Sequence, residues 1–317
     1  MWGGYSWFFA IKTCRIRPLI ACFSGGYSDG PIPIRPKERV MTHTWFITAV
    51  NSGFGREMSE QLLARGDRVV GTVRELQSVE DLHERYPESF RRLPLDVTDV
   101  AAIPKVVQRA FAEYGRVDVV VNNAGYGLFG PAEGLTNEQI RDQIDTNLVG
   151  PIHVTRAVLP HLRAQGGGRI VAMSTYGGQA AHPGASLYHA SKWGLEGFFE
   201  SLASEVAFFD IGVTIVEPGS VRTAFRRTAG TRMGADLPAY KDTPIGALRA
   251  RLADPAFAPN GDLEKMVRLI IASAHETPAP RRIVLGTDSY NMIHKALSER
   301  LASLEAQKDQ AQSTDSA

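Results

Sequence analysis

The chain has 317 residues, 44% of them hydrophobic, so it can bury one large core, and a single α/β domain is the simplest expectation. A formal net charge of +1 excludes a global field that would attract nucleic acid or an anionic membrane. Its two cysteines, Cys14 and Cys22, lie close to the N-terminus, which argues against a disulfide or thiol nucleophile in the rest of the chain and favours a reducing, cytoplasmic location.

Residues 1–40 differ in composition from the rest of the chain, being rich in glycine, proline and aromatic residues. Met41 stands just before the first strand-like run. We therefore expect residues 1–40 to be an extension, either disordered or an artefact of an upstream start site. A continuous run of about 18 apolar residues does not occur in the sequence, so we expect no transmembrane helix.

From Thr44 to about residue 287, short β-branched runs alternate with longer amphipathic runs. This alternation predicts a parallel sheet of about seven strands with helices on both faces. Strands are predicted at 45–48, 68–73, 90–95, 117–121, 169–173, 213–216 and 282–285. Helices are predicted near 54–65, 76–85, 100–114, 137–163, 187–209 and 262–275.

Three segments toward the C-terminus have other patterns. Residues 220–260 have poor periodicity, and so long a connection within one domain is typical of a substrate lid. The amphipathic stretch 290–304 predicts a terminal helix that docks through Ile293, Leu297, Leu301 and Leu304. The small, polar residues 307–317 predict a disordered tail, so that residues 41–306 form one catalytic domain.

The first strand runs through Thr48 into a turn with Gly53 and Gly55, and a helical pattern begins at once. A strand, a glycine turn and a helix N-terminus let backbone N–H groups meet a pyrophosphate, although an ordinary βα turn is the alternative. After the second strand comes Arg74, whose guanidinium suits the 2′-phosphate of NADP, unless it is simply a surface residue. We therefore expect NADP(H) as the cofactor, with NAD as a second possibility.

Tyr188 and Lys192 are four residues apart in a helical stretch. On a helix they share one face, one turn apart, so the ammonium can favour the phenolate and lower the pKa of the phenol. The pair is a candidate acid and base for proton transfer to a carbonyl oxygen. The spacing alone is weak evidence and gains weight from the other landmarks in the chain.

These landmarks together resemble the short-chain dehydrogenase/reductase family, in its single-domain branch, over residues 44–287. Family members carry a Thr-Gly-x-x-x-Gly-x-Gly turn, and this sequence has Ala49 at the first glycine. Alanine suits that turn only if its φ angle is negative. The resemblance implies a Rossmann-type, doubly wound parallel sheet and a nicotinamide-dependent oxidoreductase.

The resemblance also assigns the cofactor contacts. Asp96 is the family's adenine contact, although it could equally serve turn chemistry before Thr98. The implied cofactor-binding residues are Thr48, Asn51, Ser52, Gly53, Phe54, Gly55, Arg74, Asp96, Val97, Asn123, Ala124, Gly125, Tyr188, Lys192, Pro218, Gly219, Val221 and Thr223.

The catalytic set implied by the family is Asn147, Ser174, Tyr188 and Lys192. Tyr188 is the general acid in reduction and the base in oxidation, and Ser174 holds the substrate oxygen. Lys192 binds the nicotinamide ribose, and Asn147 orders a water in a proton relay. The histidines lack metal-ligand spacing, so no metal site is expected.

The substrate is expected to be a medium-sized, largely apolar carbonyl compound or secondary alcohol. Ser174, Tyr176, Gln179, Tyr188 and Phe225 are the predicted substrate contacts. The helix 187–209 is apolar on nearly all sides, which favours a homodimer or homotetramer. Two alternatives stay open: a non-catalytic NADP-binding sensor or scaffold, and an epimerase that recycles bound cofactor.

Overall fold

The computed structural model describes residues 42–222, 230, 232–254, 256 and 259–316. The expectation for residues 1–40 therefore lies outside the described residues. The first strand begins at Thr44, two residues after the start of the described chain.

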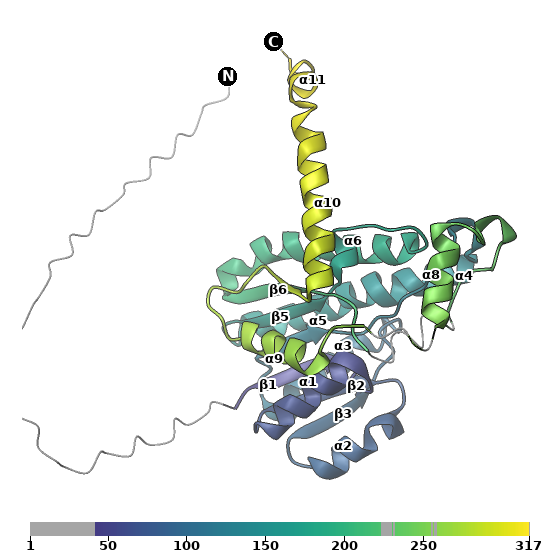
Figure 1. Cartoon of the computed structure of the whole chain (residues 1–317). Helices are drawn as coiled ribbons and strands as arrows, with labels where there is room; N and C mark the ends of the chain where they lie inside the picture. The colour runs from purple at the N-terminus through teal and green to yellow at the C-terminus, as the bar shows by residue number, and fades with distance from the viewer. Residues whose placement is uncertain (1–41, 223–229, 231, 255, 257–258, 317) are drawn as a thin grey trace, which may run out of the picture. The chain divides into compact units, whose positions relative to one another are not determined.

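Seven parallel strands form one sheet in the order β3-β2-β1-β4-β5-β6-β7 (Figure 1). This confirms the predicted doubly wound sheet. The strand order reverses between β1 and β4, and ligands of open α/β sheets bind at such a switch point, at the carboxyl ends of the strands. The strands are β1 (Thr44–Thr48), β2 (Arg68–Val73), β3 (Phe90–Pro94), β4 (Val119–Asn122), β5 (Gly168–Met173), β6 (Ile211–Pro218) and β7 (Arg282–Leu285).

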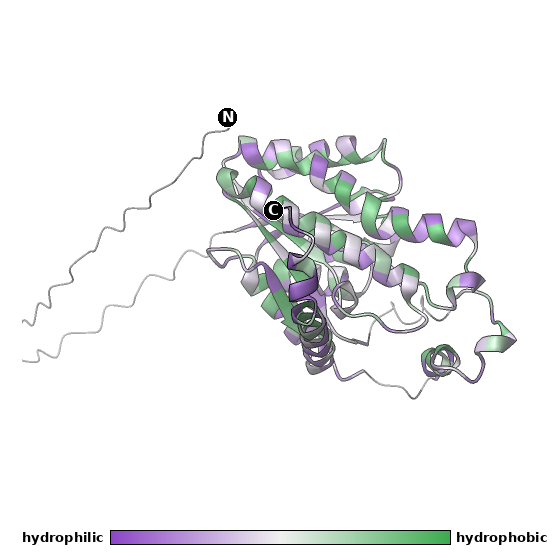
Figure 2. Cartoon of the chain, turned by 90° about the horizontal axis from the view of Figure 1, so that it is seen from above, coloured by the Kyte–Doolittle hydropathy of each residue, from purple (hydrophilic) through white to green (hydrophobic). Residues whose placement is uncertain are grey.

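The central strands are buried on both faces. All five residues of β1 are buried, and its side chains alternate between the two halves of the core, with Trp45 and Ile47 on one side and Phe46 on the other. Strands that are covered on both faces have continuous apolar sequences, which explains why they could be predicted from the sequence. In Figure 2 the helices carry both hydrophobic (green) and hydrophilic (purple) residues.

Helices cover both faces of the sheet. Helices α1, α2 and α9 pack with Trp45 and Ile47, and helices α3, α5 and α6 pack with Phe46 on the opposite face. None of the described helices is long and apolar enough to cross a membrane. The main helices are α1 (Gly53–Ala64), α2 (Glu80–Arg85), α3 (Ile103–Tyr114), α4 (Asn137–Ile144), α5 (Gly150–Ala164), α6 (Ser186–Val206), α8 (Pro244–Ala253), α9 (Leu263–Ser273), α10 (Thr287–Glu305) and α11 (Lys308–Gln312).

The predicted helix 137–163 is present but not uniform. Between α4 and α5 the chain forms a π-helical segment, η3 (Asp145–Val149), and Asn147 lies in its middle. Such π segments are rare and occur often at functional sites. Helix α8, within the predicted lid, was not anticipated, because its residues lack a clear apolar period.

The C-terminal expectations were wrong in two respects. Helix α10 is present, but of its four predicted docking residues only Ile293 is buried; Leu297, Leu301 and Leu304 are 45%, 55% and 68% exposed. The helix is anchored at its N-terminal half and extends beyond the sheet (Figure 1). Residues 308–312 form the short exposed helix α11, where we expected a disordered tail.

Candidate active site

A cleft of about 990 Å³ opens at the carboxyl ends of β1, β4 and β5. It contains residues from every part of the predicted site, from the β1–α1 turn to α6 and the segment after β6. The predicted residues that line it are Asn51, Ser52, Gly53, Phe54, Arg74, Asp96, Val97, Asn123, Ala124, Gly125, Ser174, Tyr176, Tyr188, Lys192, Pro218, Gly219 and Val221. Thr223 and Phe225 lie outside the described residues.

The β1–α1 turn keeps its left-handed geometry despite Ala49. Ala49 has φ +59°, and Gly53 has φ +56°. The expectation that alanine needs a negative φ here was therefore wrong, and the turn carries strain, because the left-handed region is unfavourable for a residue with a Cβ atom by about 1–2 kcal/mol.

The turn is tied to the end of β4. The backbone N–H groups of Asn123 and Ala124 both donate to Thr48 Oγ1 at 2.9 Å, and Asn123 Nδ2 donates to the carbonyl oxygens of Thr48 and Ala49 at 2.9 and 3.0 Å. A Cβ on Gly55 would collide with the Ala49 carbonyl and Asn123 Nδ2, so this close approach requires glycine. Thr48 and Gly55 thus do not line the cleft, but they hold the β1–α1 turn against the end of β4. We call this turn, with the start of α1, the cradle. The cradle, with the N-terminus of α1 at its edge, fits the pyrophosphate of a dinucleotide.

At the end of β2, Arg74 and its neighbour Glu75 are both exposed and both line the cleft. Asp96, after β3, also lines it, and its Oδ1 accepts hydrogen bonds from Thr98 N and Thr98 Oγ1 at 2.9 and 2.7 Å. Asp96 therefore performs the turn chemistry that was the alternative interpretation, while still lining the cleft.

The segment after β6 is held by the N-terminus of α10. Asp288 Oδ2 accepts from Ser220 N at 2.7 Å, and a Cβ on Gly219 would collide with the Asp288 carboxylate. Asp288 itself lines the cleft, a role that the sequence did not suggest.

Tyr188 and Lys192 lie one turn apart on α6, buried at the base of the cleft. Lys192 Nζ donates to the Met173 carbonyl at 2.8 Å, and burial lowers the pKa of Lys192 to about 8. Burial, reinforced by Tyr176, raises the pKa of Tyr188, while a hydrogen bond with the Thr175 side chain acts in the opposite direction. The pKa of Tyr188 is thus raised rather than lowered, contrary to the effect that we expected from Lys192.

The hydroxyl groups of Ser174 and Thr175, the two residues after β5, have different partners. Ser174 Oγ donates to Glu196 Oε1 at 2.6 Å, deep beside α6. Thr175, the next residue, is the one whose side chain hydrogen-bonds with Tyr188, and it also lines the cleft. The expectation that Ser174 holds the substrate oxygen is not supported by this geometry. The hydroxyl beside Tyr188 belongs to Thr175, which we had not singled out.

Asn147 lies behind the cleft, in the π-helical segment η3. Its Oδ1 accepts from Tyr126 N at 3.0 Å, and its Nδ2 donates to the Tyr126 carbonyl at 2.9 Å and to Ser191 Oγ at 3.2 Å. It is fully buried. Asn147 therefore fixes the loop after β4 to α6, the helix that carries Tyr188.

The wall above Tyr188 is mainly apolar. Phe129, Ala185 and Tyr188 form a small cluster with partly buried Met233, Leu248 and Leu252 packed against it. Tyr176 lines the cleft as predicted, with its hydroxyl 3.2 Å from His182 Nε2. Gln179 does not line it: its side-chain amide donates to buried Glu217, so the predicted substrate contact was wrong.

A dinucleotide cradle at a switch point, joined to a buried tyrosine and lysine, defines a nicotinamide-dependent oxidoreductase site. The short chain dehydrogenase family model matches residues 43–234. The chain belongs to the short-chain dehydrogenase/reductase family.

Two relatives and one solved structure illustrate the similarity. Oxidoreductase BOA17 of Botryotinia fuckeliana is 34% identical over 259 residues, which cover 81% of this chain and 93% of that protein. The NADPH-dependent 3-dehydrocapnine reductase of Ornithobacterium rhinotracheale is 31% identical over 212 residues, 65% of this chain and 74% of that protein. A short-chain dehydrogenase structure from Streptomyces avermitilis has a TM-score of 0.78 and 36% identity, covering 87% of this chain and 99% of that one.

Solved structures with this fold include complexes with NADP and a complex with NAD.

Proposed function

We propose that the chain is an NADP(H)-dependent oxidoreductase that transfers a hydride between nicotinamide and a carbonyl or secondary alcohol. The observation that carries the proposal is the position of the Tyr188 phenol: buried at the base of the cleft, hydrogen-bonded with Thr175, and one helical turn from Lys192. A proton donor in that position serves the oxygen that gains charge during carbonyl reduction.

The residues have separate tasks in this reaction. Burial raises the pKa of Tyr188, so the phenol keeps its proton at neutral pH and can deliver it to the substrate oxygen from its Oη atom. The Thr175 hydroxyl, bonded to Tyr188, is placed to hold the same oxygen. Lys192 is fixed on the Met173 carbonyl and supplies positive charge beside the phenol as charge develops. When bound, the nicotinamide supplies or accepts the hydride.

Arg74 supports a preference for NADP. It stands at the end of β2, exposed and on the cleft wall, where a guanidinium can pair with a 2′-phosphate. Glu75 lies beside it and would repel that phosphate or accept from a free ribose hydroxyl. We give Arg74 the larger weight because it can form bidentate contacts with a phosphate.

The substrate that fits best is medium-sized and largely apolar. The wall above Tyr188 is made by Phe129, Leu248 and Leu252, and burial of alkyl surface against them would supply binding energy of about 25 cal/mol per Å². Arg232, stacked 4.4 Å from the Tyr126 ring centroid, and Arg251 also line the cleft and suit a polar end of the same substrate. The relative from Ornithobacterium reduces a 3-keto compound by name, which is consistent with this proposal.

The test is a screen of ketones, aldehydes and secondary alcohols with both nucleotides, followed by Tyr188→Phe on the best substrate. Loss of general acid catalysis should lower kcat by roughly 10²–10⁴-fold. NADPH binding, measured by fluorescence titration, should change little, because the phenol ring remains.

Unchanged turnover in Tyr188→Phe would end this mechanism. Tight NADPH binding without turnover across the whole screen would instead favour the sensor or scaffold alternative, and net epimerisation of a substrate without net change in NADPH would favour the epimerase.

A further inference from the structure

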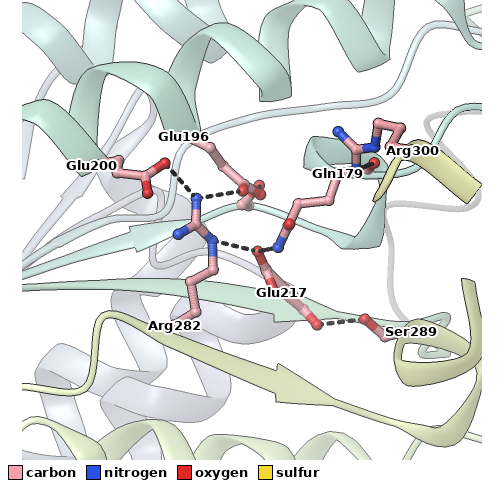
Figure 3. A network of polar contacts seen from close by, with 8 residues as sticks. Gln179, Glu196, Glu200, Glu217, Arg282, Ser289 and Arg300 are labelled. Carbon is pink, nitrogen blue, oxygen red and sulfur yellow. Dashed lines mark hydrogen bonds and ion pairs between the residues drawn. The ribbon is translucent and has the colours of Figure 1, made fainter. Parts of the chain in front are cut away.

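Two buried acids, Glu196 and Glu217, meet the guanidinium of Arg282 in a polar cluster (Figure 3). Glu196 on α6 is 3% exposed and Glu217 on β6 is fully buried. Arg282 on β7 contacts both, with Nη2 at 3.3 Å from Glu196 Oε2 and Nε at 3.1 Å from Glu217 Oε1. The proposed reaction uses none of these three side chains.

The charges of this cluster do not balance. Arg282 Nη2 also pairs with Glu200 at 3.0 Å, so one guanidinium faces three carboxylates, two of them buried. Glu217 Oε2 is buried and lacks a hydrogen-bond partner among the described residues. When two neighbouring buried carboxyl groups share one proton, the excess of negative charge falls and a buried oxygen gains a hydrogen-bond partner. Burial, together with the charge of Glu217, raises the pKa of Glu196 to about 7, against the smaller opposing effects of Ser174 and Arg282.

The two acids hold opposite ends of one short segment. Ser174 Oγ donates to Glu196, and the Gln179 side chain donates to Glu217. Between these anchors lie Thr175, whose hydroxyl bonds with Tyr188, and Tyr176, which lines the cleft. The Thr175 hydroxyl also donates to the carbonyl of Pro218, the residue after Glu217, at 3.3 Å. The position of Thr175 therefore depends on the segment that the two acids hold and on the strand that carries Glu217.

We propose that Glu196 is a positioning residue: by sharing one proton with Glu217, it holds the segment Ser174–Gln179 so that the Thr175 hydroxyl stays beside Tyr188. When the shared proton is lost, the two buried carboxylates repel each other, and both anchors of the segment are displaced. The rate then falls as pH rises through the neutral range. This inference rests on the proposed function, because Thr175 matters only if it holds the substrate oxygen.

Other charged groups around the cluster are accounted for. They are Glu217 on β6, Arg282 on β7, Glu200 on α6, Arg300 on α10, which donates to the Gln179 carbonyl, and His189 on α6, which packs against Gly177. Buried Lys192, one turn before Glu196 on α6, is a further cation, and the charge of Glu196 opposes the lowering of the Lys192 pKa by burial. Burial lowers the pKa of His189 to about 4, so His189 stays neutral while the acid pair titrates.

The experiment compares Glu196→Gln with the matched control Glu200→Gln. A glutamine at position 196 can still accept from Ser174 and removes one of the two buried charges, so it imitates the protonated state of the pair at every pH. We expect the wild-type kcat for carbonyl reduction to fall between about pH 6 and pH 7.5, below the range in which Lys192 loses its proton, Glu196→Gln to lack that fall, and Glu200→Gln to retain it. Glu196→Ala should lower kcat about tenfold or more at every pH, because the anchor is missing.

A second readout does not depend on activity. A buried, protonated carboxyl group has a C=O infrared band distinct from that of a carboxylate. We expect such a band to vanish as the wild-type protein is titrated upward through neutral pH, and to be absent from Glu196→Gln. If Glu196→Gln does not fold, Glu217→Gln serves the same two measurements, since it also leaves a single charge in the pair.

The inference is overturned if Glu196→Gln keeps the wild-type pH dependence, or if the wild-type protein shows no titrating carboxyl band that the substitution removes. If the infrared band behaves as expected but no carbonyl compound is reduced, the proposed function is wrong, whereas the shared proton between Glu196 and Glu217 is confirmed.

Discussion

At the scale of single residues, two adjacent hydroxyls after β5 have different partners. Ser174 and Thr175 are neighbours in an extended chain, so their side chains point to opposite sides. Ser174 points to Glu196 on α6 and Thr175 to Tyr188. Proximity in sequence therefore says little about which of them reaches the substrate.

We expect Thr175→Ala to lower kcat for carbonyl reduction by roughly 10²–10³-fold, the usual effect of removing a donor to a developing oxyanion. Thr175→Ser, which keeps the hydroxyl, should recover most of the activity. Ser174→Ala should have a smaller effect, because it removes an anchor and not the donor. A larger loss in Ser174→Ala than in Thr175→Ala would restore the original assignment of Ser174.

Arg74 can be tested in the same way. Arg74→Ala should weaken NADPH binding by about 1.5–3 kcal/mol, the usual contribution of hydrogen bonds to a charged group, and should leave NADH binding unchanged. Arg109→Ala, at another exposed arginine, which lies on α3 and does not line the cleft, is the control. Fluorescence titration that finds equal affinities for both nucleotides, and no effect of Arg74→Ala, would contradict the preference for NADP.

At the scale of elements, the site is built from joints between strands and helices. The β1–α1 turn is fixed to β4 through Thr48 and Asn123, and the loop after β4 is fixed to the π segment η3 through Asn147. At each joint, a side-chain amide or hydroxyl forms hydrogen bonds with backbone groups that have no partner within the sheet at the edge of the cleft. These joints hold the cofactor cradle and the tyrosine helix in register.

The strained residue of the first joint yields a stability prediction. Ala49→Gly should raise the free energy of unfolding by about 1 kcal/mol, because glycine adopts φ near +60° freely, although the more flexible unfolded chain offsets part of the gain. Thermal unfolding should show a Tm higher by about 2 °C for a domain of this size. A lower Tm, or weaker NADPH binding, would show that the Cβ atom of Ala49 makes a useful contact.

At the scale of the whole molecule, the feature that the fold leaves unexplained is exposed apolar surface. Helix α10 presents Leu297, Leu301 and Leu304 on one stripe, all exposed. On α6 Trp193 is 42% exposed beneath the guanidinium of Arg300. Such surface in a single chain is typical of contacts between subunits.

We therefore expect a homodimer or homotetramer at micromolar concentration, measured by sedimentation velocity. Leu301→Lys should shift the population toward smaller species, whereas Ser303→Lys, on the opposite side of α10, should not. A wild-type protein that sediments as a strict monomer would contradict this expectation.

The sequence by itself determined the sheet, most of the helices and the residue types of the cleft. It could do so because buried strands are continuous apolar runs, and because local motifs such as the glycine turn, Asn123 to Gly125, and Tyr188 with Lys192 act within a few residues of one another. The sequence did not predict that one side of α10 is exposed, because a periodic pattern does not say what covers an apolar face. It also did not predict helix α8, because the apolar periodicity of that segment is weak.

Only the tertiary structure decided which side chains enter the cleft. Ser174 lines the cleft, but its hydroxyl is bonded to Glu196, 22 residues further along, and Gln179 turns away because its partner Glu217 lies 38 residues further along. Such partners meet only when α6 and β6 pack together, so no local spacing encodes them. The pKa of Tyr188 also depends on the tertiary structure: burial by the folded chain raises it, because the penalty for burying a charge is set by everything around it.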